Sequence, residues 1–310
     1  MNTPVAFLVF NRPECTARTL AAIREARPPR LLVVADGPRP GNSNDRARCS
    51  EVRALIDRLV DWPCLVERNY AAENMGCAQR VASGLTWAFS CCERLVVIED
   101  DCLPDPSFFR FCDELLDRYA DDTRIGQISA CPRYFSAVRR SASYLFSRYG
   151  AIWGWASWRR AWASYSINLE TWPRFSSTGG LEAVVQSRAE HELRSALYQR
   201  LYEAPPDTWD FQWGYAKLSQ GMLSIVPCRN LVENIGFAGG GAHIASGGRF
   251  PLKRLRMEFP LRHPEFVLPD IQFDRAYSRA FTDECRRPVW KRVVTRLQRA
   301  VGASEALATP

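Results

Sequence analysis

The chain of 310 residues can bury one large core or two small ones, and its 24% of charged residues is ordinary for a soluble globular protein. Its net charge is +7, but thirteen Lys and Arg against seven Asp and Glu from residue 249 onward contribute +6 of it. The rest of the chain is near neutral, which argues against a nucleic-acid groove running through it.

The apolar runs and the cysteines bear on the cellular compartment of the protein. Runs such as Leu31 to Ala35 and Leu95 to Ile98 are too short to cross a bilayer. No basic segment precedes the first strand-like run, so we expect no signal peptide. The eleven cysteines are an odd number, scattered and without a CxxC pair. We therefore predict a cytoplasmic protein with free thiols, held on the inner face of the membrane if its tail binds lipid.

The first hundred residues alternate strand and helix patterns. Short buried runs predict strands at 5–10, 30–35, 64–67 and 94–98. Apolar residues at helical spacing predict helices at 13–26, 45–60 and 76–91. Strands that alternate with helices form a parallel sheet covered on both faces, and ligands bind beyond the carboxyl ends of its strands. This rule brings one set of polar side chains to a single crevice: Asn11, Arg12, Asp36, Asn74, Glu99, Asp100 and Asp101.

The pattern changes after residue 120. We predict a strand at 125–130, an aromatic-rich stretch at 144–162, a helix at 181–202, a strand at 225–227 and a glycine-rich loop at 236–248. The predicted organisation is one α/β domain at 1–248, with a nucleotide-binding half at about 1–102 and an acceptor half at about 103–248. Residues 249–310 form a basic C-terminal extension.

Glu99-Asp100-Asp101 is the most informative segment. Three carboxylates directly after a buried strand repel each other and cannot all be buried unpaired. Mg²⁺ or Mn²⁺ would solve that problem, because either ion takes oxygen ligands from carboxylates and from a substrate's phosphates. A solvated loop is the alternative, and the position at the end of a central strand favours the metal.

Other polar residues each allow a structural and a functional interpretation. Asp36, in Asp36-Gly37-Pro38, either opens a turn or accepts a hydrogen bond from a nucleobase. Asn74 suits a helix N-cap, and the helix that opens at Gly76 could hold a phosphate with help from Arg80. His243, within the glycine-rich loop, suits metal ligation or a diphosphate contact better than a core position.

The aromatic segments also have two readings. Trp153, Gly154 and Trp155 form either core or the wall of a sugar pocket, because indole faces stack on sugar rings. Trp209 precedes Asp210, whose apolar surroundings would suit a general base. Asp210 is otherwise a helix N-cap, and the nearby Asp207 competes with it for either role.

The basic tail carries a narrow apolar stripe over 288–300. From Arg286 to Arg299 there are six basic residues and no acidic one. Such a helix either rests on anionic lipid, where a lipid-linked acceptor would be presented, or docks on the domain with a solvated basic face.

The segment Leu95 to Phe109, with its Glu-Asp-Asp and Pro-Asp-Pro-Ser-Phe-Phe, resembles the metal-binding segment of GT-A glycosyltransferases. The N-acetylglucosaminyltransferase I group and the bacterial family 2 transferases show the nearest form. The opening that ends at Phe10, Asn11 and Arg12 falls in the same order as in those enzymes. Asp36-Gly37, Asn74-Met75-Gly76, Gly154-Trp155, Trp209-Asp210 and the loop with His243 do so too. The resemblance covers residues 4 to 245 and implies a GT-A fold, a Rossmann-like, mostly parallel sheet flanked by helices.

The resemblance also implies roles for single residues. Asp101 would ligate the metal, Asp100 would bind ribose and Glu99 would contact the donor sugar. Asp36 would hold the base, with uracil expected, and Asp210 would deprotonate the acceptor. Related enzymes carry Trp-Asp-Asp-Trp where this chain has Trp209-Asp210-Phe211-Gln212-Trp213, which makes the base less secure than the metal site.

These features together predict a metal-dependent, inverting transferase. It would move a hexosyl or N-acetylhexosaminyl group from a nucleotide-sugar donor to a glycan or lipid-linked acceptor in surface polysaccharide synthesis. The metal and Arg80 would neutralise the diphosphate leaving group. Two alternatives stay open. One is a catalytically weak nucleotide- or glycan-binding relative. The other is a sugar nucleotidyltransferase, which the glycine-free turn Asn11-Arg12-Pro13-Glu14 disfavours.

Overall fold

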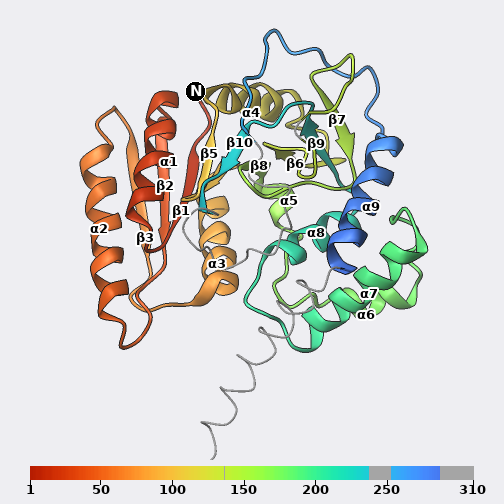
Figure 1. The fold of residues 1–310 in the computed structure, drawn as a ribbon, viewed down its shortest axis with the longest axis horizontal. Helices are drawn as coiled ribbons and strands as arrows, with labels where there is room; N and C mark the ends of the chain where they lie inside the picture. The colour runs from red at the N-terminus through yellow and green to blue at the C-terminus, as the bar shows by residue number, and fades with distance from the viewer. Residues whose placement is uncertain (136, 237–252, 287–310) are drawn as a thin grey trace, which may run out of the picture.

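A computed structural model describes residues 1–135, 137–236 and 253–286. Its centre is a sheet of eight strands in the order β3-β2-β1-β4-β8-β6-β9-β7, with helices on both faces (Figure 1). A separate two-stranded sheet pairs β10 with β5. The predicted α/β fold, a sheet flanked by helices, is thus confirmed. The sheet is mixed, and β3, β2, β1 and β4 are parallel to one another.

The first half follows the predicted alternation closely. Its elements are β1 (Val5–Val9), α1 (Pro13–Ala26), β2 (Arg30–Ala35), α2 (Ser43–Leu59), β3 (Leu65–Tyr70), α3 (Gly76–Cys91) and β4 (Arg94–Glu99). β1 is buried along its whole length, and its alternate residues enter different cores. Val5, Phe7 and Val9 pack with α1, α2 and α4, whereas Ala6 and Leu8 pack with α3 and α8. The sheet therefore separates two apolar layers, as a doubly covered sheet requires.

The second half is less regular. Its elements are β5 (Cys102–Pro104), α4 (Pro106–Arg118), β6 (Ile125–Ser129), β7 (Tyr144–Ser147), β8 (Trp155–Trp158), α5 (Arg159–Trp162), α6 (Trp172–Ser177), α7 (Arg188–Glu203), α8 (Asp210–Ser219), β9 (Leu223–Pro227), β10 (Val232–Asn234) and α9 (Ile271–Arg286). β8 runs antiparallel to both β4 and β6, and β7 runs antiparallel to β9. The aromatic-rich stretch thus supplies two strands, one of them next to β4.

One predicted boundary in this half is wrong. The helix expected at 181–202 begins only at Arg188, where the Ser187 side chain accepts a hydrogen bond from the Glu190 backbone N–H. Residues 181–184 form turns instead, although Leu181 is buried. Its apolar character reflects packing with α6 and α7 rather than a place in the helix.

The part of the predicted C-terminal extension that is described packs on the body. In α9, Asp274 is fully buried and accepts a hydrogen bond of 2.6 Å from Ser147 Oγ. Tyr277 stacks on Tyr149 with ring centroids 4.7 Å apart. The apolar stripe predicted at 288–300 lies outside the described residues. Within the part of the chain that is described, no helix is both long and apolar enough to cross a membrane.

Candidate functional site at the carboxyl end of β4

The acidic triplet lies where the central strand ends. β4 stops at Glu99, which pairs with Leu8 of β1, and the chain turns through Asp100 and Asp101 into β5. Exposure of the side chain is 3% for Asp100 and 14% for Asp101. Glu99 Oε1 is buried and has no hydrogen-bond partner among the described residues. Three carboxylates are therefore adjacent at this strand end, with the Asp100 side chain and one Glu99 oxygen shielded from water and Asp101 partly exposed.

Arg12 offsets part of this negative charge. It lies between β1 and α1, where Pro13 occupies the first turn of the helix. Its Nη2 lies 2.7 Å from Asp100 Oδ1, and its Nη1 lies 2.8 Å from Asp101 Oδ2. One guanidinium thus bridges two of the three carboxylates, and the site keeps an excess of negative charge.

Burial shapes the protonation of the two inner acids. It raises the pKa of Glu99 well above its usual range, and the charges of Asp101 and Asp100 add to the effect. Burial also raises the pKa of Asp100, while the ion pair with Arg12 opposes that rise. Acids in this situation are stabilised in their charged form by any further cation that reaches them.

The donor set fits a hard divalent cation. Carboxylate oxygens are the ligands that Mg²⁺ and Mn²⁺ prefer. Asp101 is the more exposed of the two aspartates that Arg12 binds, and Arg12 contacts only its Oδ2. Its Oδ1, which accepts a contact of 3.5 Å from the Cys102 thiol, is the oxygen that a cation could reach first. The described residues contain no preformed group of three or more His, Cys, Asp or Glu side chains for a metal. His243, the other predicted ligand, lies outside those residues.

Gly236 lies directly against this pair of side chains. A Cβ added there would collide with Asp101 Oδ2 and come within 3.0 Å of Arg12 Nη1. The preceding residue, Ile235, donates its backbone N–H to the Asp101 carbonyl at 2.8 Å. Ile235 and Gly236 are therefore held against the acidic triplet, and any larger residue at position 236 would displace the Asp101 and Arg12 side chains.

Asp36, at the end of β2, holds the loop that precedes α3. Its Oδ1 accepts hydrogen bonds from the backbone N–H groups of Gly37 and Met75, at 2.8 and 2.9 Å. Its Oδ2 accepts one of 2.9 Å from Asn74 Nδ2. Burial raises the pKa of Asp36, although the Met75 and Gly37 hydrogen bonds oppose it. Its predicted contact with a nucleobase stays a prediction.

A cavity of about 490 Å³ opens near the same strand end. Its walls come from the loop after β2, from Cys49 and Arg53 of α2, and from Glu73. Arg53 donates hydrogen bonds to the carbonyls of Asp36 and Ala71, at 3.2 and 2.8 Å. The volume lies in the range of small-ligand sites. No sequence pattern indicated this cavity, because it forms only where α2 packs beside the loops that follow β2 and β3.

The N-terminus of α3 is occupied by a side chain from the second half. The backbone N–H of Ala78 donates to Asp207 Oδ1 at 2.6 Å. Gly76 has φ +78°, and a Cβ there would lie 2.9 Å from the same oxygen. Asn74 is not the cap of α3, since its side chain is bonded to Asp36 and Met75 holds the N-cap position. The N-terminus of α3 was predicted to bind a phosphate, but its Ala78 N–H is bound by the Asp207 carboxylate.

Three more predicted nucleotide contacts are tied to neighbouring elements. Arg80 is 6% exposed, donates to Asn69 Oδ1 at 2.8 Å, and has its pKa lowered by burial. Asn11 donates to Asp45 Oδ1 of α2 at 2.7 Å. The Phe10 backbone N–H donates to Asp100 Oδ2 at 3.4 Å. Phe10 and Asn11 lie beside the acidic triplet, whereas Arg80 is buried against β3.

The tryptophans divide into buried and accessible ones. Trp155 and Trp209 are 0% and 3% exposed, and their rings stack at 5.9 Å. Neither presents a ring face to solvent, so both are core residues in this structure. Trp153 is half-buried and lies 5.4 Å from the Arg133 guanidinium. Gly154 has φ +66°, with Ala130 Cβ 3.2 Å from where its own Cβ would lie, which favours glycine between the two indoles.

Asp210 is the first residue of α8 and accepts a hydrogen bond from Thr208 Oγ1. Its charge contributes to the raised pKa of Glu99, so the two acids lie within electrostatic range. Asp207, its competitor in the sequence, is engaged at the N-terminus of α3. Of Asp207 and Asp210, only Asp207 accepts a hydrogen bond from the backbone of α3, and Asp210 is bonded to the Thr208 hydroxyl.

Cys77 marks the meeting point of the acidic residues and was not predicted. Burial raises the pKa of its thiol, and so do the charges of four carboxylates: Glu99, Asp207, Asp210 and Asp36. These acids come from β4, from the end of β2 and from the start of α8. In the sequence, a cysteine within a helix is interpreted as a small core residue, so no pattern indicated that Cys77 lies among these acids.

Comparisons with known proteins give distant likenesses only. No family model matches the sequence, and no curated protein matches it. A mannosyltransferase from Pyrobaculum calidifontis, in complex with GDP-Man and Mn²⁺, is 16% identical over 70% of each chain, with a TM-score of 0.39. Mouse xyloside xylosyltransferase 1 is 11% identical over 73% of this chain and 85% of its own, with a TM-score of 0.37.

A UDP-glucose pyrophosphorylase bound to UDP-glucose is 10% identical over 76% of this chain and 94% of its own, with a TM-score of 0.39. Such values carry no functional argument. The order of the strands, the antiparallel β8 beside β4 and the acidic turn after β4 are features of this chain itself. On these features, the chain has a mixed α/β fold with helices on both faces of its sheet and an acidic turn at the end of its central strand.

Proposed function

We propose that the chain is a metal-dependent glycosyltransferase that uses a nucleotide-diphosphate sugar. The observation that carries the proposal is the partly buried triplet at the end of β4, whose charge Arg12 offsets only in part. A structural loop would expose such acids to water, whereas the Asp100 side chain and one oxygen of Glu99 are shielded from it. A site with this excess charge suits a divalent cation and the phosphates that accompany it.

The residues around the triplet have distinct tasks in this proposal. A Mn²⁺ or Mg²⁺ ion, held by Asp101, would supply Lewis-acid neutralisation of the donor's diphosphate. Arg12 releases Asp101 and turns its guanidinium to a phosphate, a bidentate partner equivalent to the carboxylate. Arg12 takes this task in place of Arg80, which is buried against β3. Asp100 stays on the Phe10 amide, close to the ribose.

Asp210 serves as the base in this proposal. It lies within electrostatic range of Glu99, which would contact the donor sugar in this proposal. Asp210 would take the proton of the acceptor hydroxyl as its oxygen bonds to the anomeric carbon, on the side opposite the nucleotide diphosphate. The bond between that carbon and the diphosphate breaks in the same step, the nucleotide diphosphate leaves, and the anomeric centre inverts. The base of the nucleotide, uracil in our proposal, would occupy the cavity beside Asp36. The acceptor is a glycan or a lipid-linked glycan of surface polysaccharide synthesis, reached from the cytoplasm.

The experiment measures cation binding and turnover separately. UDP-, GDP- and dTDP-sugars are screened by thermal shift with and without Mn²⁺, because a bound ligand raises apparent stability. Mn²⁺ binding is followed by electron paramagnetic resonance, and release of nucleotide diphosphate reports turnover. Asp101→Asn should lower both by at least about 100-fold. Asp121→Asn, at an exposed acid, is the matched control and should change neither.

Arg12→Gln separates the two roles given to this arginine. Removing the guanidinium frees both aspartates, so Mn²⁺ should bind more tightly than in the wild-type chain. Turnover should fall, because the phosphate contact is lost. Unchanged Mn²⁺ affinity in both Asp101→Asn and Arg12→Gln would refute the metal site.

The ion pairs of Arg12 also favour one alternative, a nucleotide- or glycan-binding protein with little activity. In that case Arg12 replaces the cation permanently, and the acids serve only to hold it. A donor sugar that stabilises the chain equally with and without Mn²⁺, and is not turned over with any acceptor, would support this alternative over the transferase.

A further inference from the structure

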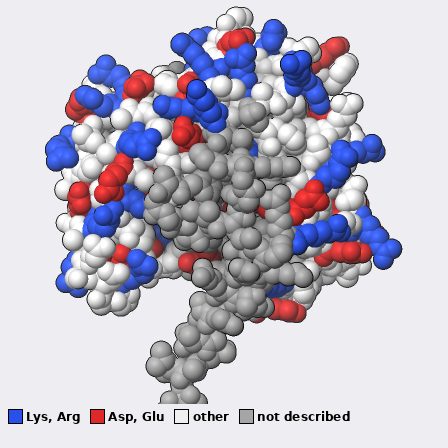
Figure 2. Space-filling view, in the orientation of Figure 1, with Lys and Arg blue, Asp and Glu red and all other residues white. Residues whose placement is uncertain are grey.

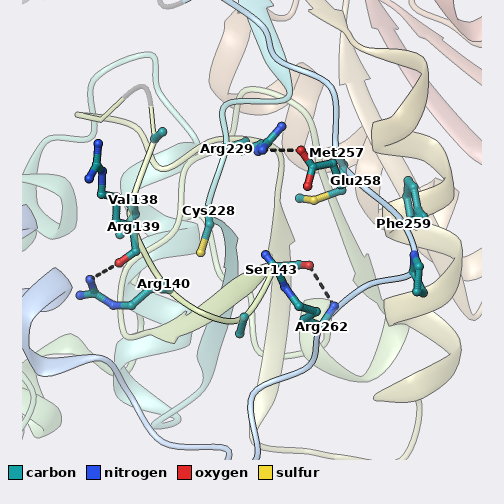
Figure 3. Close-up of a pocket in the computed structure, with 13 residues that line it drawn as sticks. Val138, Arg139, Arg140, Ser143, Cys228, Arg229, Met257, Glu258, Phe259 and Arg262 are labelled. Carbon is teal, nitrogen blue, oxygen red and sulfur yellow. Dashed lines mark hydrogen bonds and ion pairs between the residues drawn. The ribbon is translucent and has the colours of Figure 1, made fainter.

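A second cavity, of about 510 Å³, lies apart from the acidic triplet. Its walls are the loop before β7, the residues that follow β9, and segment 257–262 (Figure 3). It shares no lining residue with the cavity near Asp36, and none of the predicted catalytic or nucleotide-binding residues lines it. This separation makes it a distinct site rather than part of the donor pocket.

Arginines dominate the polar lining of this cavity. Figure 3 shows Arg139 and Arg140 on one side of Cys228 and Ser143, with Arg229 and Arg262 on the other. Arg229 pairs with Glu258 at 2.6 Å, and Arg140 pairs with Asp270 at 2.6 Å. Arg139 and Arg262 have no acidic partner among the described residues. The lining thus holds four cations against one carboxylate, a clear excess of positive charge.

The surrounding charge has the same sign. Segments 137–143, 228–229 and 253–262 together contain seven Lys and Arg residues and one acidic residue. In the view of Figure 2, blue side chains gather along the upper edge, the region that Figure 1 assigns to β7 and the segment after residue 252. A field of one sign around a concave site raises the local concentration of anions.

The walls of the cavity are held by backbone hydrogen bonds. Cys228 donates its N–H to the Ser143 carbonyl at 2.9 Å, and Val138 donates to the Cys228 carbonyl at 2.8 Å. Ser143 in turn donates to the Arg262 carbonyl at 2.8 Å. The Arg262 N–H donates to Ser143 Oγ at 2.9 Å, which leaves the hydroxyl hydrogen free for a ligand. The three segments therefore form one rigid frame for the arginines.

We propose that this cavity binds a phosphate or diphosphate group. Guanidinium groups bind phosphate with two parallel hydrogen bonds, and two of the four arginines have no competing acid here. The volume lies within the range of small-ligand sites. Met257, Phe259 and Cys228 add an apolar part to the lining, which would cover the body attached to the phosphate. A phospholipid head group and a soluble phosphate ester share this chemistry.

The test uses the full chain in EDTA, so that no divalent ion assists binding at the acidic triplet. Pyrophosphate is titrated by calorimetry, and hydrogen–deuterium exchange locates the site. We expect protection of segments 137–143 and 257–262. The double variant Arg139→Gln/Arg262→Gln should weaken binding by at least about tenfold, since two charge-assisted contacts are lost.

A charge-matched control is Arg58→Gln/Arg279→Gln, at two exposed arginines on α2 and α9. It should leave pyrophosphate affinity unchanged. Equal weakening in the two double variants, or protection confined to other segments, would overturn the proposal. Folding is checked by comparing the melting temperatures of the variants in the absence of ligand.

A second arm distinguishes the two sources of phosphate. Vesicles of phosphatidylcholine with and without phosphatidylglycerol are sedimented with each variant. Binding of the wild-type chain to anionic vesicles that is lost in Arg139→Gln/Arg262→Gln but kept in the control assigns a lipid head group. Pyrophosphate binding without vesicle binding assigns a soluble phosphate ester. Absence of both refutes the site.

Discussion

The two halves of the central sheet are built on different rules. Among β3, β2, β1 and β4 every pairing is parallel, and one helix separates consecutive strands in the chain. In β8, β6, β9 and β7 three of the pairings with a neighbour are antiparallel, counting that of β8 with β4. The regular half contributes Arg12, Asp36 and the acidic triplet, and the irregular half contributes Asp210 and Asp207. The candidate site thus draws residues from both the regular and the irregular half of the sheet.

The comparison teaches where stability is concentrated. The regular half packs aliphatic side chains of strands against helices, so its core is spread over many similar contacts. The irregular half relies on a few large aromatic rings, such as the cluster of Trp155, Trp162, Trp209 and Trp213. Single substitutions should therefore have their largest effects in the irregular half.

The largest effect on stability is expected for Trp155→Ala. The ring is fully buried between Trp209 and Trp213, so its removal leaves a cavity that costs about 4 kcal/mol of unfolding free energy. Denaturant unfolding measures the loss. Trp153→Ala, at a half-buried ring, is the comparison and should cost clearly less. Similar small losses in the two variants would show that the cluster is not the core of this half.

Lys217 should make the stability of the same half depend on pH. Burial, together with the smaller effect of the Arg194 charge, lowers the pKa of this lysine to about 7, and Nζ donates a hydrogen bond of 2.7 Å to Ser224 Oγ. The unfolded chain keeps the proton up to about pH 10.4, so it binds more protons than the folded chain between about pH 7 and 10.4. Stability contributed by Lys217 therefore rises with pH in that window.

Lys217→Met tests this directly. From pH 7 to pH 9 the wild-type unfolding free energy should gain about 2.3 kcal/mol from this residue, and the variant should lack that gain. Denaturant midpoints at the two pH values, taken for both chains, give the difference. Parallel pH profiles for the two chains would mean that Lys217 keeps its proton in the folded state.

Gly76→Ala probes the contact between the halves. The φ of +78° strains any other residue, and the added Cβ meets Asp207 Oδ1, which is bonded to the Ala78 amide. We expect a loss of about 2 kcal/mol. Gly41→Ala is the matched control, because Gly41 has φ +71° but open space around it. It should cost about 1 kcal/mol, and equal costs at the two positions would argue against a tight Asp207 contact.

The smallest effect is expected at the surface of the regular half. Arg68 pairs with Asp57 at 2.5 Å between side chains that are 41% and 55% exposed. Exposed pairs of this kind contribute less than about 1 kcal/mol, so Arg68→Gln should hardly move the denaturation midpoint. A loss comparable to that of Trp155→Ala would mean that stability is not concentrated as the comparison states.

The regular half was predictable because its signals are local. A run such as Leu31 to Ala35 must be buried on both faces, and the helices at 13–26 and 76–91 carry apolar residues at helical spacing. The irregular half lacks such signals. Leu181 is apolar and buried but lies before the helix, and Trp155 reads equally as core or as pocket wall.

The amino-acid sequence by itself determined that a buried strand ends in Glu99-Asp100-Asp101 and that parallel strands bring Arg12 and Asp36 to the same edge. Periodicity and turn residues act over a few positions, so they can be read along the chain. Only the tertiary structure decided that Arg12 bridges the two aspartates, that Asp207 rather than Asn74 meets the start of α3, and that four arginines surround one cavity. Those pairings join residues up to 129 positions apart and depend on how whole elements pack, which no local pattern encodes.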